Sequence, residues 1–107
     1  MINTITISGN LTADIEVKEY GDNKHLGSFS VAVNDRLRSD DSVYFFPCVI
    51  FNENMLKSIK DYLVKGQKVA VTGKMCQNFY EREGKKLSNW TVSVNDIELC
   101  GKKDDWK

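Results

Sequence analysis

The chain has 107 residues, 41% of them hydrophobic, and its 15 basic residues balance its 15 acidic ones. This length suits a single domain that buries its own core. Because the formal net charge is zero, a polyanionic ligand would have to be held by a local basic patch. The composition therefore argues against any ligand that is attracted by bulk charge alone.

The three cysteines, Cys48, Cys76 and Cys100, are far apart, and His25 is the only histidine. No Cys-x-x-Cys pair occurs, so we expect neither a zinc site nor a cofactor. An odd number of separated cysteines fits a reducing compartment. The N-terminus lacks the charged and then apolar profile of a signal peptide. We therefore expect a cytoplasmic protein.

The N-terminal third of the chain predicts extended structure. Residues 2–11 alternate apolar and polar side chains, which indicates a half-buried strand. Gly9 within it indicates a bulge or a close backbone approach. Residues 13–20 continue the extended segment up to a turn at 21–24, and residues 26–34 form the next strand.

Residues 43–51 are the most apolar stretch of the sequence, and they follow a polar loop at 35–42. Nine residues between polar flanks are too few to span a membrane and predict a strand. Phe45 and Phe51 share one side of that strand, so rings stay available to a ligand if the other side is core. Pro47 has no N–H, so the ladder should break there, at an edge or a bulge.

Residues 52–65 predict the only helix. Asn52 or Asn54 can cap its start, and Gly66 stands where a left-handed terminating residue belongs. Its apolar residues recur at helical spacing and should form one buried face. They are Met55, Leu56, Ile59, Tyr62 and Leu63.

Strands at 67–77 and 89–99 should follow, joined by a polar hairpin whose tip is at 83–86. Trp90, Val92 and Val94 should point inward. This order predicts an all-β OB-fold, a five-stranded Greek-key barrel with one helix between strands 3 and 4, which binds oligonucleotides or oligosaccharides. We expect the domain to cover residues 1–101, with a short charged tail at 102–107.

Several segments also resemble, in order and spacing, the bacterial and phage single-stranded DNA-binding (SSB) proteins. The resemblance runs over roughly residues 2–100, and its segments are residues 5–11, 29–34, 45–51, 61–69 and 71–74. It implies a homotetramer that coats and protects single-stranded DNA, without strong sequence preference, during replication, recombination or repair. The family's Gly/Pro/Gln-rich tail with its acidic tip has only a faint echo in 102–107, so its recruiting role does not carry over.

The resemblance also implies which residues touch nucleic acid. Phe45, Phe51 and Tyr80 fall on stacking positions, while Leu37 stands where the family often has Trp. Pro47, Cys76 and Asn78 stand where family members often carry basic residues, which should weaken phosphate contact there. The expected contacts are Arg36, Leu37, Arg38, Phe45, Phe51, Lys74, Phe79, Tyr80, Arg82, Lys85 and Lys86.

Two other classes of function stay open at this point. A nuclease would need clustered carboxylates to hold metal, and the adjacent pairs at 40–41 and 104–105 diverge in a loop and a tail. An SSB-like module that docks on a replication complex, as primosome-type proteins do, is the alternative to a DNA-coating protein. The sequence does not separate a DNA from an RNA strand as ligand, or a host gene from a phage gene.

Overall fold

The computed structural model describes residues 1–35 and 42–101. The expected contacts Arg36, Leu37 and Arg38 and the expected tail at 102–107 lie outside these residues. The described elements, in chain order, are β1 (Ile5–Leu11), β2 (Glu16–Gly21), β3 (Lys24–Asn34), β4 (Val43–Ile50), α1 (Glu53–Ile59), the 3₁₀ turn η1 (Lys60–Tyr62), β5 (Lys68–Arg82) and β6 (Lys85–Cys100).

The strands form one sheet in the order β1-β5-β6-β4-β3-β2. An additional β1–β3 pairing closes the five strands from β1 to β3 into a ring, and β2 pairs with β3. All neighbours are antiparallel except β4 and β6, which pair in parallel at Cys48 and Val49. The first expected strand is divided into β1 and β2 by residues 12–15. With those two counted as one bent strand, the architecture is the expected OB-fold with its single helix between the third and fourth strands.

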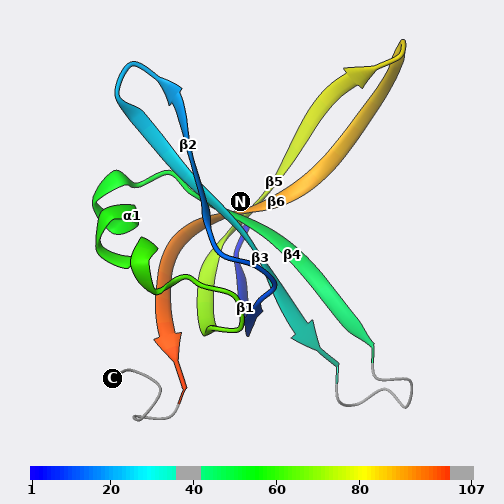
Figure 1. The fold of residues 1–107 in the computed structure, drawn as a ribbon. Helices are drawn as coiled ribbons and strands as arrows, with labels where there is room; N and C mark the ends of the chain where they lie inside the picture. The colour runs from blue at the N-terminus through cyan, green and yellow to red at the C-terminus, as the bar shows by residue number, and fades with distance from the viewer. Residues whose placement is uncertain (36–41, 102–107) are drawn as a thin grey trace.

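The core fills the interior of this closed sheet, and α1 lies along one side of it (Figure 1). Its buried members come from β1, β3, β4, β5, β6 and the helical segment. They are Leu11, Phe29, Val31, Cys48, Ile50, Leu56, Leu63, Val69, Val71, Val92, Val94 and Ile97. Burial of these apolar side chains is the main force that holds the sheet closed.

The helix begins as expected, because the Asn52 side chain accepts the N–H of Met55 at 3.1 Å. Gly66 has φ 89°, the left-handed conformation that glycine adopts most easily. The α-helix is shorter than expected, since α1 ends at Ile59 and tightens into η1. That tightening changes the angular spacing of the side chains, so Leu63 stays buried but Tyr62 is exposed, contrary to the prediction.

Gly9 marks a close approach between β1 and β3, as the sequence indicated. A Cβ placed on Gly9 would lie 2.1 Å from the carbonyl oxygen of Ala32. At Pro47 the prediction was only half right. The ladder between β3 and β4 runs through Pro47 without interruption, while the pairing of β4 with β6 begins at Cys48. Pro47 is thus tolerated because one side of β4 has no neighbour there.

Two hairpins, β2–β3 and β5–β6, project from the same end of the barrel and diverge (Figure 1). The β5–β6 hairpin is longer than expected, because its pairing continues from Lys68 opposite Cys100 to Arg82 opposite Lys85. Glu83 and Gly84 form its tip with φ 53° and 77°. Positive φ at both central residues is typical of the two-residue turns that match strand twist.

Candidate nucleic-acid interface

The aromatic strand β4 has one buried and one open side. Cys48 and Ile50 are buried, and Phe46 packs against the core from the same side. Phe45 is 64% exposed, and Phe51, just beyond the strand, is 49% exposed. The alternation expected from the sequence is therefore confirmed, and two rings lie on the outside of the barrel.

Strand register extends this outer side of β4 onto the β5–β6 hairpin. Val49 lies beside Ser93 of β6, and Ser93 is opposite Lys74 of β5. Side chains of a strand alternate between its two sides, so Lys74 and Tyr80 share the outer side with Phe45. Tyr80 is 41% exposed. We call the side that carries Phe45, Phe51, Lys74 and Tyr80 the outer aromatic face.

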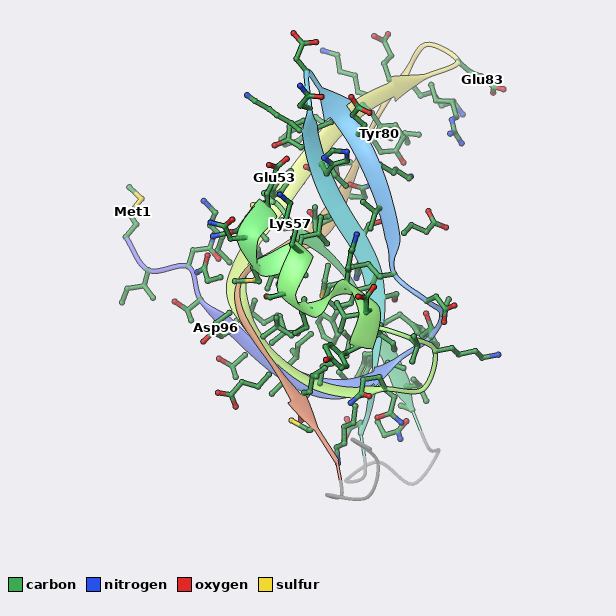
Figure 2. All side chains as sticks on the ribbon, turned by 60° about the vertical axis from the view of Figure 1, so that its left-hand side comes forward. Met1, Glu53, Lys57, Tyr80, Glu83 and Asp96 are labelled. Atoms are coloured by element: carbon green, nitrogen blue, oxygen red, sulfur yellow. The ribbon has the colours of Figure 1, made fainter. Side chains whose placement is uncertain are left out.

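The hairpin divides the remaining expected contacts between its two sides. Arg82 and Lys85 are opposite each other and lie on the side of Tyr80. Phe79 is opposite Ser88, and Lys86 is opposite Glu81, so both lie on the other side of the hairpin. The register thus puts Phe45, Phe51, Lys74, Tyr80, Arg82 and Lys85 on one side of the sheet, and Phe79 and Lys86 on the other. Figure 2 shows Tyr80 on this hairpin, with Glu83 at its tip.

Trp90 is on the same side of β6 as the buried Val92, the expected inward direction, but it is 51% exposed and therefore not part of the core. The reason is that the hairpin extends beyond the barrel. The pairing of β1 with β5 ends where Ile5 meets Gly73, and the Asn3 side chain then bonds both backbone groups of Met75 at 2.8 and 3.0 Å. In the described parts of the chain, no strand other than β6 pairs with β5 beyond Gly73.

Polar contacts fix the hairpin beneath Tyr80. The Asn78 side-chain amide donates to Asn89 Oδ1 at 3.2 Å and to Thr91 Oγ1 at 3.1 Å across the two strands. No ion pair among the described residues engages Lys74, Arg82 or Lys85. These three cations are therefore available to phosphate groups, on the same side of the hairpin as the Tyr80 ring.

The sequence reasoning did not single out Tyr20, which lies on β2. Its ring meets that of Phe51 edge-on, with centroids 6.2 Å apart and planes at 88°. The two residues are far apart in sequence, and no periodicity links them. Only the fold reveals that they belong to the same surface.

The thiol of Cys48 is buried in the core, on the side of β4 away from the outer aromatic face. Burial raises the pKa of Cys48 to about 12, so its thiol stays protonated at neutral pH. No group of three or more His, Cys, Asp or Glu residues that could hold a metal is present in residues 1–35 and 42–101. Within the same residues, no helix is long and apolar enough to cross a membrane.

Comparison with known proteins places this geometry in context. A model of the Single-strand binding protein family matches residues 2–100. The chain is 36% identical over 104 residues to the single-stranded DNA-binding protein of Treponema pallidum, covering 94% of this chain and 58% of that protein. It is 30% identical over 103 residues to the protein of the same name from Fusobacterium nucleatum, covering 92% and 66%. The chain thus spans less than two thirds of either relative.

A solved structure of the Plasmodium falciparum SSB complex with ssDNA has the same fold. It superposes with a TM-score of 0.84 at 20% sequence identity, covering 94% of this chain and 96% of that one. An identity this low supports the architecture and not the individual contacts.

Proposed function

The chain belongs to the single-strand binding protein family, and we propose that it coats and protects single-stranded DNA during replication, recombination or repair. Binding has little sequence preference, because every base has a flat face that can stack on an aromatic ring. The role is one of binding without catalysis. A magnesium-dependent cleavage assay on labelled single strands tests that last point, and cleavage would contradict it.

The observation that carries the proposal is the outer aromatic face. Phe45, Phe51 and Tyr80 keep about half of their surface in water, and exposed apolar groups gathered on one side of a protein are typical of a binding site. Stacking on such a ring contributes about 1–3 kcal/mol per base. The cations Lys74, Arg82 and Lys85 lie on the same side, and a single strand that engages all three gives a salt slope of about −2.

The test is a titration of oligo-dT with wild type, Phe45→Ala and Tyr80→Ala, followed by fluorescence anisotropy of the labelled strand. Each substitution should weaken binding by about 1–3 kcal/mol while the fold stays intact by circular dichroism. Tyr62→Ala is the matched control, since Tyr62 is an exposed ring on η1. Equal affinity of both variants and wild type would mean that the strand binds elsewhere.

A protein-interaction module of the primosome type is the second candidate. The exposed rings of Phe79 and Trp90 on the inner side of the hairpin favour it. On that side Lys86 is opposite Glu81, so the two charges cancel and do not attract a polyanion. The same titration discriminates the two. A module binds oligo-dT weakly at moderate salt and shows no loss of affinity in Phe45→Ala.

We also propose a homo-oligomer, with a tetramer favoured over a dimer. β1 pairs with β5 from Ile5 to Asn10 but with β3 only at Asn10 and Leu11, so part of its second edge is open. A groove of about 590 Å³ adjoins that edge and is lined by Ser8, Gly9, Asn10, Ala32, Asn34 and Lys68. A monomer mass in light scattering at micromolar concentration would contradict this.

The proposed setting is the cytoplasm of a bacterium, or of the host cell if the gene belongs to a phage. The three free cysteines support it. Single-stranded RNA is a second ligand to compare, and oligo-rU in the same titration measures the preference.

A further inference from the structure

The contact between Tyr20 and Phe51 adds a feature to the outer aromatic face. Tyr20 is 50% exposed, and the rings stand almost perpendicular, with their centroids 6.2 Å apart. This is an edge-to-face arrangement of the kind that aromatic pairs prefer. Because both rings stay half in water, they form an open corner rather than part of the core.

Such a corner matches the shape of a nucleobase. A base that stacks flat on one ring has its edge against the face of the other ring. Every base offers both a π-face and a polarised edge, so the corner holds a base without reading its identity.

Two lysines flank the corner on the β2–β3 hairpin. Lys18 is two residues before Tyr20 on β2, and Tyr20 lies where the register of β2 with β3 shifts, between Glu19 and Gly21. Lys24 is paired with Gly21, and its aliphatic chain passes 3.7 Å from the point where a Gly21 Cβ would lie. One lysine thus precedes Tyr20 and the other follows it on the same hairpin.

The charge on Lys18 is only loosely engaged. Its Nζ lies 3.8 Å from a Glu16 carboxylate oxygen, and both side chains are about two-thirds exposed. An ion pair this open contributes little to stability, so a phosphate can replace the carboxylate. No ion pair within the described residues involves Lys24.

We propose that Tyr20, together with Phe51, Lys18 and Lys24, forms a nucleotide subsite that carries the single strand onto the β2–β3 hairpin. One base occupies the corner of the two rings, and the adjoining phosphates meet the two lysines. The inference rests on the proposed function, because it concerns the path of the same single strand. It extends that path beyond the residues expected from the sequence.

The first experiment compares Tyr20→Leu with Tyr20→Phe in oligo-dT titrations. Loss of the ring should weaken binding about 5- to 150-fold, while Tyr20→Phe keeps the ring and binds like wild type. Tyr62→Leu is the control for an exposed tyrosine elsewhere. Affinity of Tyr20→Leu equal to wild type, with Phe45→Ala still impaired, would overturn the subsite and leave the proposed function standing.

Tyr20 could also act only by holding Phe51 in place, and a second comparison tests that. On a Phe51→Ala background, Tyr20→Leu should cause a further loss of at least about 3-fold, since the ring itself stacks on a base. Photo-cross-linking with a 5-iodouracil oligonucleotide should label the peptide that contains Tyr20. No further loss and no label on that peptide would refute direct contact.

The lysines have their own readout, the dependence of affinity on salt. Lys18→Gln and Lys24→Gln should each make the salt slope shallower by about 0.7. Lys57→Gln is the matched control. Lys57 is on α1 and lines a small cavity with Val17, His25 and Glu53, on the other side of the β2–β3 hairpin from Lys18. Unchanged slopes in both hairpin variants would remove the phosphate part of the subsite. Failure of wild type to bind oligo-dT at all would instead refute the proposed function.

Discussion

Phe45 and Phe46 are sequence neighbours on opposite sides of β4, and truncating each in turn separates binding from folding. Phe45 is 64% exposed, so Phe45→Ala should change the free energy of unfolding by less than about 1 kcal/mol and weaken oligo-dT binding about 5- to 150-fold. Phe46 packs on the core while partly accessible. Phe46→Ala should therefore destabilise the fold by about 2–3 kcal/mol, below the range for a fully buried ring.

Urea unfolding followed by circular dichroism and oligo-dT titration, both at the same salt concentration, measure the two quantities. Phe45→Leu is the matched control, because it keeps apolar volume but has no ring. It should lose most of the roughly 1–3 kcal/mol that stacking on the ring contributes. The reverse result, a destabilised Phe45→Ala and an impaired but stable Phe46→Ala, would refute the reasoning. It would mean that the register of β4 is shifted by one residue, which moves every side chain to the other side.

Three further outcomes follow from the structure. Gly9→Ala should lower the free energy of unfolding by about 2 kcal/mol or more, because its Cβ would lie 2.1 Å from the Ala32 carbonyl oxygen; an unchanged urea midpoint would show that β1 and β3 separate freely. Burial raises the pKa of Cys48 from 9.0 to about 12, so the folded protein keeps a proton that the unfolded chain loses above pH 9. This proton linkage should lower the free energy of unfolding by about 1.4 kcal/mol by pH 10. In urea titrations, the free energy of unfolding of Cys48→Ala should fall less between pH 8 and pH 10 than that of wild type. Lys85→Ala should make the salt slope of oligo-dT binding shallower by about 0.7, and Lys86→Ala should change it little; equal effects would mean that both sides of the hairpin contact the strand.

Local signals were enough to predict β4 and the start of the helix. Alternation along 43–51 depends only on the geometry of an extended chain, and the Asn52 cap depends on a contact with Met55, three residues later. The exposure of Trp90 could not be predicted in the same way. Trp90 lies on the same side of β6 as Val92, but its burial would require the barrel to extend that far. The pairing of β1 with β5 ends at Gly73, before this part of the hairpin.

The division of the hairpin into two sides was also beyond the sequence. Thr72 is opposite Asp96 and Gly73 is opposite Val94, so Asn95 has no partner and β6 carries a bulge. The bulge explains why Ile97 and Val94 are both buried although their parity differs. A straight strand would put them on opposite sides. Which of Phe79 and Tyr80 joins Phe45 follows only from this register.

The zero net charge of the chain is compatible with binding a polyanion, because the charges are unevenly distributed. The outer side of the β5–β6 hairpin carries Lys74, Arg82 and Lys85, while Glu81 is on the inner side. At physiological salt, exposed charges are screened beyond about 8 Å, so an approaching strand responds to this patch and not to the total. Long-range steering should therefore be weak, and affinity should come from rings and cations that act only in contact. A local arrangement of this kind is sufficient for the proposed binding of single-stranded DNA by a chain with balanced composition.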